Sequence, residues 1–307
     1  AIFSKSLKYY MNIWSDLKTP PVTTLRDANG KCLATLVDNA DLKKRVDAVS
    51  GQRELFSFTT ADGVVLNGWM VKPRNFDPSK RYPVLMYQYS GPGSQEVKDG
   101  WGSGFMSGLV FESYLASQGY IFVCVDGRGT GARGADFEKC TYLRLGDLES
   151  HDQVETAMWL GQQPYVDKDR IGIWGWSFGG FNTLMSMSEG RPVFRCGVAV
   201  AAPSNWRYYD TVYTERFMRT PQENENYNTI SPIGRADKLS GELLLIHGTA
   251  DDNVHFRNCA EVSEAYVQAN KQFQMQVYTN RNHFILGGNT RNHLMTRIVD
   301  FFNEKMK

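Results

Sequence analysis

One serine in the sequence lies in a setting that suits nucleophilic chemistry. The segment Gly175-Trp176-Ser177-Phe178-Gly179 has the pattern G-x-S-x-G, preceded by an apolar run and followed by a helix-forming stretch. In that context the serine stands on a tight strand-to-helix turn, where small neighbours let the backbone take strained angles. The pattern alone also occurs in turns without chemistry, but these flanking elements favour a nucleophile. We therefore predict that Ser177 attacks an acyl carbon and forms a covalent intermediate.

A serine hydroxyl needs a base, usually a histidine that is held by a carboxylate. With this nucleophile pattern the chain order is serine, acid, histidine, each on a loop after a later strand. We take His283 as the base, because it follows the strand-like run 274–278 and precedes the last helical stretch. The other four histidines fit the base less well. His151 precedes Ser177 and His247 ends a strand-like run, while His255 lies just past the candidate acids and His293 lies inside the last helical stretch.

The acid is expected in the loop after the strand-like run 243–247. That loop offers two adjacent carboxylates, Asp251 and Asp252. Spacing alone does not separate neighbouring aspartates, so the residue pattern leaves both as candidates.

Apolar runs alternate with helical stretches from about residue 51 to the end of the chain. We expect strands at 84–89, 121–126, 171–175, 243–247 and 274–278, helices at 104–117, 152–162, 180–188, 257–269 and 289–303, and a hairpin at 56–71. This alternation requires a mostly parallel sheet with helices on both faces. The few charges within the strand-like runs suit a sheet that is buried on both sides. Residues 51–307 are therefore predicted to form a doubly wound α/β domain of the α/β-hydrolase fold.

The first fifty residues follow a different pattern. Two strand-like runs, 23–25 and 31–37, flank an Asn29-Gly30 turn, and a short helical stretch follows at 41–46. Because no crossover helix separates these strands, they are expected to pair antiparallel. Residues 1–50 are predicted to be the end of a separate β domain.

Composition excludes several functional classes. Among 307 residues, 42% are hydrophobic and the net charge is +1, so a large core is expected and nucleic acid is an unsuitable partner. No apolar run reaches the roughly 18–20 residues that span a bilayer, and the first ten residues lack the apolar segment of a signal peptide. Without an initiator Met, the chain is expected to start inside a longer or processed one. The five cysteines lack C-x-x-C spacing, which argues against a zinc site or disulfide framework: Cys32, Cys124, Cys140, Cys196 and Cys259.

Five segments together resemble the prolyl oligopeptidase family of serine peptidases, and within it the dipeptidyl peptidase IV subfamily in a bacterial form. They are 89–95, 126–129, 174–180, 206–216 and 247–255. The resemblance implies an α/β-hydrolase catalytic domain, with residues 1–50 as the last strands of an upstream β-propeller. It also implies peptide substrates, no cofactor or metal, a homodimer, and a periplasmic, secreted or cell-surface location.

The resemblance also assigns roles to residues. It makes Asp251 the acid of a triad with Ser177 and His283. It also makes the Phe178 N–H and the Tyr89 hydroxyl the donors that stabilise the oxyanion. A side-chain donor is needed because the H-G-G-G loop of esterases is missing here. Relatives often carry Tyr at the position of Phe178, which leaves the backbone N–H unchanged. The pocket for the residue before the cut bond would be formed by Phe178, Trp206, Tyr209, Tyr213 and Val254, and Asn253 would hold the preceding carbonyl.

These roles predict an exopeptidase that releases N-terminal dipeptides with Pro or Ala in the penultimate position, through an acyl-enzyme on Ser177. The acidic pair that binds the substrate amine would lie in the propeller. A carboxylesterase is a second interpretation, and the missing H-G-G-G loop argues against it. A non-catalytic adhesion module is a third, and the complete Ser, Asp and His set argues against that. A fourth is that the segment is inert without its propeller.

Overall fold

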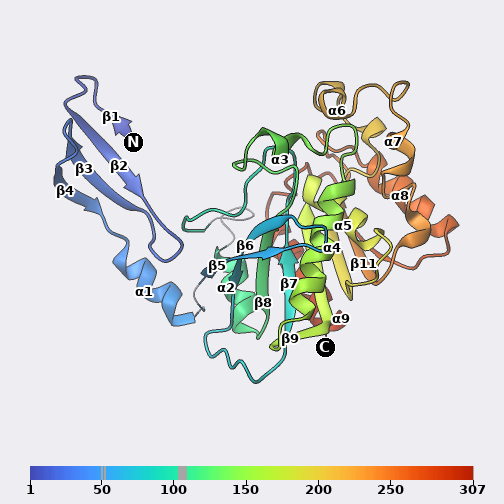
Figure 1. The fold of residues 1–307 in the computed structure, drawn as a ribbon, viewed down its shortest axis with the longest axis horizontal. Coiled ribbons are helices and arrows are strands. Elements are labelled where there is room, and N and C mark those ends of the chain that lie inside the picture. Colours follow the sequence, from blue (N-terminus) through green and yellow to red (C-terminus); the bar gives the residue numbers. More distant parts are fainter. Residues whose placement is uncertain (50, 52, 103–108, 307) are drawn as a thin grey trace.

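The computed structural model describes residues 1–49, 51, 53–102 and 109–306. Within these residues the chain forms an antiparallel four-stranded sheet and a mixed eight-stranded sheet (Figure 1). The larger sheet has the order β12-β11-β10-β9-β7-β8-β6-β5. Its strands are β5 (Arg53–Thr59), β6 (Val65–Val71), β7 (Tyr82–Tyr87), β8 (Ile121–Asp126), β9 (Val166–Trp176), β10 (Cys196–Val200), β11 (Glu242–Gly248) and β12 (Gln274–Tyr278).

The larger sheet is parallel from β12 to β8, and β6 and β5 continue it antiparallel. Its central strands are apolar without alternation because both faces are buried there. In β7, Val84 and Met86 pack on one face while Leu85 and Tyr87 pack on the other. This confirms the predicted fold class, a doubly wound α/β-hydrolase domain with a mostly parallel sheet.

Helices cover both faces of the larger sheet. The helices are α2 (Leu109–Ser117), α3 (Ala135–Lys139), α4 (Asp147–Gly161), α5 (Phe178–Met187), α6 (Thr211–Met218), α7 (Asn226–Thr229), α8 (Arg257–Gln268) and α9 (Thr290–Lys305), with short 3-10 turns η1 (Trp206–Tyr208) and η2 (Ala236–Lys238). Helices α4, α5 and α8 supply side chains to the core on one face, and α2 and α9 supply the other. Within the described part of the chain, no helix has the length and apolar character that a bilayer span requires.

Some sequence expectations differ from the structure. The prediction omitted β10. This strand lies between β9, which precedes Ser177, and β11, which precedes the acidic loop. Its five residues are mostly small, so the run 196–200 carries a weak strand signal. Helix α4 begins at Asp147, five residues before the predicted start. Of the predicted helix 104–117, the structure describes 109–117 as α2, and residues 104–108 lie outside the described part.

The strands of the N-terminal sheet stand apart from the larger sheet, and helix α1 (Ala40–Val49) leads from one to the other (Figure 1). Hydrogen bonds from the Leu17 N–H to Asp99 Oδ1 and from the Trp101 N–H to Ser15 Oγ also link the two parts. The strands of the N-terminal sheet are β1 (Ile2–Phe3), β2 (Tyr9–Trp14), β3 (Val22–Asp27) and β4 (Cys32–Val37), all antiparallel. The predicted turn is present, with Gly30 at φ 88° and its N–H donating to the Asp27 carbonyl at 3.0 Å. Every residue of β4 is exposed, so this sheet buries little surface of its own.

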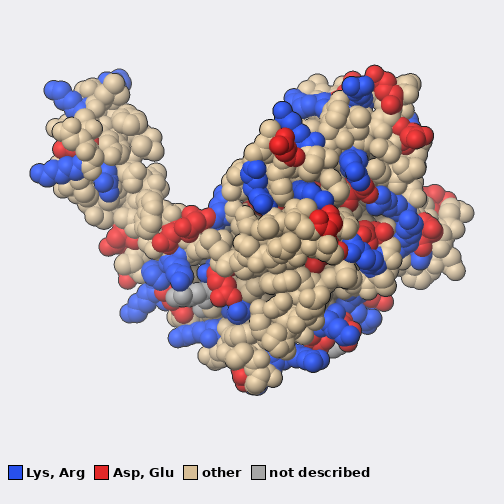
Figure 2. Space-filling view, viewed as in Figure 1, with Lys and Arg blue, Asp and Glu red and all other residues tan. Residues whose placement is uncertain are grey.

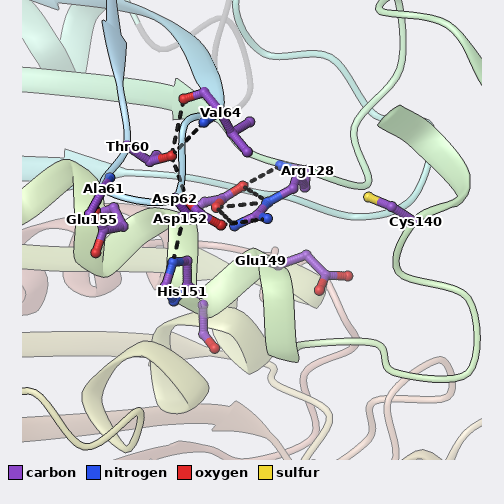
Figure 3. Close-up of polar contacts among 12 residues, drawn as sticks. Thr60, Ala61, Asp62, Val64, Arg128, Cys140, Glu149, His151, Asp152 and Glu155 are labelled. Atoms are coloured by element: carbon purple, nitrogen blue, oxygen red, sulfur yellow. Dashed lines mark hydrogen bonds and ion pairs between the residues drawn. The ribbon is translucent and has the colours of Figure 1, made fainter. Parts of the chain in front are cut away.

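Arg128 centres an ionic network that ties the loop after β8 to helix α4 and to the β5–β6 hairpin (Figure 3). Its guanidinium lies 2.6 Å from Asp152 Oδ1 and 2.9 Å from Asp62 Oδ2. Asp152 also accepts the Arg128 backbone N–H at 2.7 Å, so its buried carboxylate is both paired and hydrogen-bonded. The next residues, 129–131, form two backbone hydrogen bonds with 93–94, the loop that follows β7. The network therefore supports the loop that begins at Tyr89.

Candidate active site

The predicted catalytic residues come from four loops that meet at one edge of the larger sheet. Tyr89 follows β7, Ser177 follows β9, Asp251 follows β11 and His283 follows β12. These strands run parallel, so their carboxyl ends lie at the same edge. Crevices at this edge are where open α/β sheets place ligands.

Ser177 occupies the strained turn that its sequence pattern predicts. Its backbone has φ 60° and ψ −120°, a conformation that costs a non-glycine residue roughly 1–3 kcal/mol. Its N–H donates to the Val200 carbonyl of β10 at 2.8 Å. A Cβ on Gly175 would lie 2.3 Å from the Gly179 carbonyl oxygen, and one on Gly179 would lie 2.4 Å from the Gln88 carbonyl oxygen. Both glycines are therefore required by close backbone contact.

His283 and Asp251 form a buried hydrogen-bonded pair. The His283 Nδ1 lies 2.8 Å from Asp251 Oδ2, and each residue is 5% exposed. Asp251 Oδ1 accepts the backbone N–H groups of Asn253 at 3.0 Å and Val254 at 2.8 Å. Burial opposes ionisation of Asp251, but hydrogen bonds from two histidines and the backbone hold its pKa well below the usual range. An ionised Asp251 holds the proton on Nδ1, which leaves Nε2 of His283 free to accept one.

The loop that carries His283 is hydrogen-bonded to the residue before Ser177. The indole N–H of Trp176, the residue before Ser177, donates to the His283 carbonyl at 3.0 Å. The bond is buried and joins positions 107 residues apart in the sequence. The Arg291 guanidinium lies 4.9 Å from the centre of the Trp176 ring and stacks on it. These contacts hold the backbone of His283 against the residue directly before Ser177.

Two hydrogen-bond donors flank Ser177, the predicted nucleophile. Burial raises the pKa of the Tyr89 phenol, and a hydrogen bond between Tyr89 and Ser177 partly offsets that rise. Tyr89 is therefore a neutral donor with its hydroxyl at the serine. Phe178 is the first residue of α5, and the first N–H groups of a helix have no partner within the helix and favour negative charge. The arrangement suits stabilisation of a developing oxyanion.

A second histidine contacts the acid, which the sequence prediction missed. His247, which the sequence places at a strand end, is 1% exposed near the end of β11. Its Nε2 also lies 2.8 Å from the Val254 carbonyl and 3.4 Å from Asp251 Oδ2. His247 therefore braces the loop that holds the acid. The spacing of four residues between His247 and Asp251 was the only sequence signal for this contact.

The His247 contact predicts a pH dependence of stability. Burial alone would lower the pKa of His247, but hydrogen bonds to Asp251, Cys259 and the Val254 carbonyl raise it from 6.5 to about 9. Because the folded-state value is raised, this stabilisation is complete below pH 6.5 and is lost as the pH rises through 9. Over that window the free energy of unfolding should fall by about 2–3 kcal/mol more in the wild type than in His247→Gln. Urea unfolding of both proteins between pH 6.5 and about 9 measures this difference in the free energy of unfolding. Parallel pH profiles for the two proteins would contradict the prediction.

Four aromatic side chains predicted to form the substrate pocket lie in one cluster. Ring centroids are 5.4 Å apart for Phe178 and Trp206, 5.8 Å for Trp206 and Tyr213, and 5.3 Å for Tyr209 and Tyr213. Trp206 lies in η1, Tyr213 lies in α6 and Tyr209 lies between these elements, all in the segment between β10 and β11. Asp210 starts α6 by accepting the Tyr213 N–H at 2.7 Å, which orients this side of the cluster.

The acidic loop closes the other side of the cluster. The Tyr209 hydroxyl donates to Asn253 Oδ1 at 2.8 Å, and Val254 is fully buried behind it. Because Asp251 fixes the N–H groups of both Asn253 and Val254, one carboxylate organises the base and the pocket wall together. Within the described ranges, no group of three or more His, Cys, Asp or Glu side chains could hold a metal ion.

Comparison with known proteins identifies the family. The sequence model of the Prolyl oligopeptidase family matches residues 110–307, well over half of the chain. The chain belongs to the prolyl oligopeptidase family. The resemblance predicted from the five sequence segments is confirmed.

Members of the prolyl oligopeptidase family match the chain along almost its whole length. Dipeptidyl peptidase 4 of Felis catus is 40% identical over 98% of the chain, and Prolyl endopeptidase FAP of Mus musculus is 36% identical over 99%. The crystal structure of Porphyromonas gingivalis dipeptidyl peptidase 4 is 50% identical over 99% of the chain, with a TM-score of 0.93. The chain spans only 39%, 40% and 43% of the lengths of these three relatives.

Proposed function

We propose that this chain is the catalytic domain of a serine exopeptidase that releases N-terminal dipeptides with Pro or Ala in the penultimate position. One observation carries the proposal. The Asp251–His283 pair is fastened beside Ser177, whose backbone is strained and whose side chain is hydrogen-bonded to Tyr89. The names of the relatives support the substrate class.

The geometry supports acyl transfer in two steps. His283 Nε2 takes the proton of Ser177 Oγ as that oxygen attacks the peptide carbonyl, and Asp251 stabilises the imidazolium that results. The Phe178 N–H and the Tyr89 hydroxyl stabilise the oxyanion. His283 then gives the proton to the leaving amine. Water, activated by the same imidazole, hydrolyses the ester on Ser177 and releases the dipeptide.

The aromatic cluster supports the preference for proline. Rigid, flat rings lose little conformational entropy on binding and suit a small cyclic side chain. Since the Tyr209 hydroxyl donates to Asn253 Oδ1, the Asn253 Nδ2 is the group left to donate to the substrate. We assign that donation to the carbonyl of the residue before proline.

We propose that an upstream β-propeller completes the enzyme. The N-terminal sheet is antiparallel, exposes all of β4, and is joined to the catalytic domain through α1. Figure 2 shows this sheet as a separate lobe, with opposite charges interspersed over the larger lobe. The upstream part of the propeller would cover this sheet, which would form the propeller's last strands, and would supply the acidic pair for the substrate amine. A homodimer at a periplasmic, secreted or cell-surface location belongs to the same proposal.

Hydrolysis of two substrates tests the proposed specificity. The chain, produced together with its upstream sequence, should cleave Gly-Pro p-nitroanilide with a higher kcat/KM than p-nitrophenyl butyrate. The amide with proline fits the aromatic pocket, and the ester presents only a short acyl group. Efficient hydrolysis of the ester without the anilide would instead indicate a carboxylesterase. The N-acetylated anilide is the control, because blocking the amine should remove the activity of an exopeptidase.

Replacement of Tyr89 by phenylalanine should lower kcat by roughly 10²–10³-fold, the usual effect of losing one oxyanion donor. The ring and its contact with Phe178, with centroids 6.1 Å apart, should persist in the variant. Steady-state hydrolysis of Gly-Pro p-nitroanilide measures the effect, with KM expected to change little. Turnover close to that of the wild type would remove the Tyr89 hydroxyl from the site.

A further inference from the structure

Gln88 is a fully buried polar residue directly before Tyr89, and its side chain contacts helix α5. Its Nε2 donates to the Gly179 carbonyl at 2.7 Å and to Thr183 Oγ1 at 3.1 Å. Gly179 lies in the first turn of α5, one residue after Phe178. The side chain of Gln88 therefore reaches from the strand that presents one predicted oxyanion donor to the helix turn that presents the other.

The carbonyl end of the same amide fixes the chain on the far side of Tyr89. Gln88 Oε1 accepts from Ser90 Oγ at 3.0 Å and from Asn182 Nδ2 at 3.1 Å. Ser90 has φ 66°, in the left-handed region, so the backbone turns sharply just after Tyr89. Tyr89 thus lies between two residues whose side chains are bonded to each other. With these contacts, both donors and both acceptor sites of the Gln88 amide are used.

The backbone of α5 at Gly179 also packs closely on the backbone of Gln88 and Tyr89. A Cβ on Gly179 would lie 2.4 Å from the Gln88 carbonyl oxygen and 3.2 Å from Tyr89 Cα. The first turn of α5 therefore packs directly on the backbone of Gln88 and Tyr89. An aliphatic side chain could fill the volume of Gln88 without the cost of burying an amide, so filling the core does not by itself require a polar group here.

We propose that Gln88 is a positioning residue for the oxyanion hole, which sets the Tyr89 hydroxyl relative to the Phe178 N–H. It touches neither substrate nor reacting atoms and acts through Tyr89. This inference rests on the proposed acyl-transfer function. Misplacement of a catalytic group by about 1 Å can lower a rate by up to roughly 10²-fold. Loss of the Gln88 hydrogen bonds should therefore lower the rate of the chemical step.

The test combines Gln88→Met with Tyr89→Phe. Methionine keeps the approximate length and volume but cannot form the four hydrogen bonds. We expect Gln88→Met to lower kcat roughly 10–100-fold with KM changed less than about 3-fold, because positioning acts on the transition state. In the Tyr89→Phe background the same change should lower kcat less than about 3-fold, since the group that it positions is already absent.

Ser186→Ala provides the matched control. Ser186 is fully buried in α5 and donates to the Asn182 carbonyl at 2.6 Å, and among the described residues its hydroxyl is not hydrogen-bonded to Gln88. This variant should lose thermal stability and keep kcat. Equal losses of kcat from Gln88→Met in both Tyr89 backgrounds, or unchanged kcat in the wild-type background, would overturn the proposal.

The rate of acylation by p-nitrophenyl acetate separates this inference from the proposed peptide specificity. This small ester needs the oxyanion hole but neither the aromatic pocket nor a bound amine. If the wild type reacts with the ester and not with the Gly-Pro anilide, the proposed specificity fails. The acylation rates of the Gln88 and Tyr89 variants with the ester still test the Gln88 proposal in that case. If all variants react alike with the ester, the Gln88 proposal fails even where the anilide is cleaved.

Discussion

Ser177→Ala should eliminate covalent labelling by a fluorophosphonate probe and lower peptide turnover by about 10⁶-fold. The substitution removes the oxygen that becomes the acyl-enzyme ester, so no intermediate can form. Alanine tolerates the φ of 60° about as well as serine, since Ala132 and Ala201 of this chain adopt φ values of 66° and 48°. The turn should therefore persist. Intact mass of the purified chain after labelling measures the first effect and hydrolysis of Gly-Pro p-nitroanilide measures the second, while thermal unfolding checks that the fold persists.

The same helix supplies the control for this experiment. Ser186→Ala removes the hydroxyl of a buried serine inside α5, which donates to the Asn182 carbonyl at 2.6 Å, and should leave labelling unchanged. If Ser177→Ala were labelled at the wild-type rate while folded, another nucleophile would have to be found and the site would be wrongly assigned.

Local patterns predicted the parallel part of the fold well. The runs in β7, β8, β11 and the second half of β9 are apolar because both faces of the sheet are buried there, and that pattern is visible in the sequence. Strand β12, at the edge of the sheet, is more polar and only partly buried. Strand β10 was missed because Cys196-Gly-Val-Ala-Val200 is short and mostly small. It is a strand because its edges pair with β9 and β11, a long-range cause that no local window contains.

The candidate site could be located from the sequence because parallel strands fix where their loops end. Ser177 and His283 lie after β9 and β12, so strand order alone brings both to one edge of the sheet. Distant side-chain contacts could not be predicted this way. The bond from Trp176 to the His283 carbonyl joins positions 107 residues apart, and the bond from Gln88 to the Gly179 carbonyl joins positions 91 residues apart. Such pairs depend on how the layers pack rather than on any local pattern.

Asp251→Asn should lower kcat by about 10⁴-fold with little loss of binding. Asparagine can keep its carbonyl oxygen on the N–H groups of Asn253 and Val254, which Asp251 Oδ1 accepts at 3.0 and 2.8 Å. Its NH₂ group then faces Nδ1 of His283, where Asp251 Oδ2 lies at 2.8 Å. That donor forces the proton of the imidazole onto Nε2, which can no longer accept the proton of Ser177. Steady-state kcat and KM for Gly-Pro p-nitroanilide measure the effect.

Asp252→Asn decides between the two adjacent aspartates. It makes the same chemical change one residue away, on a side chain that is exposed, and should leave kcat unchanged. The two variants also lose the same formal charge, so a general electrostatic effect would lower both alike. A loss confined to Asp251→Asn, and partly relieved at high pH as hydroxide helps remove the serine proton, would mark a wrong tautomer of His283 rather than unfolding. Equal losses in both variants would mean that the charge of the loop, and not the carboxylate facing His283, supports the reaction.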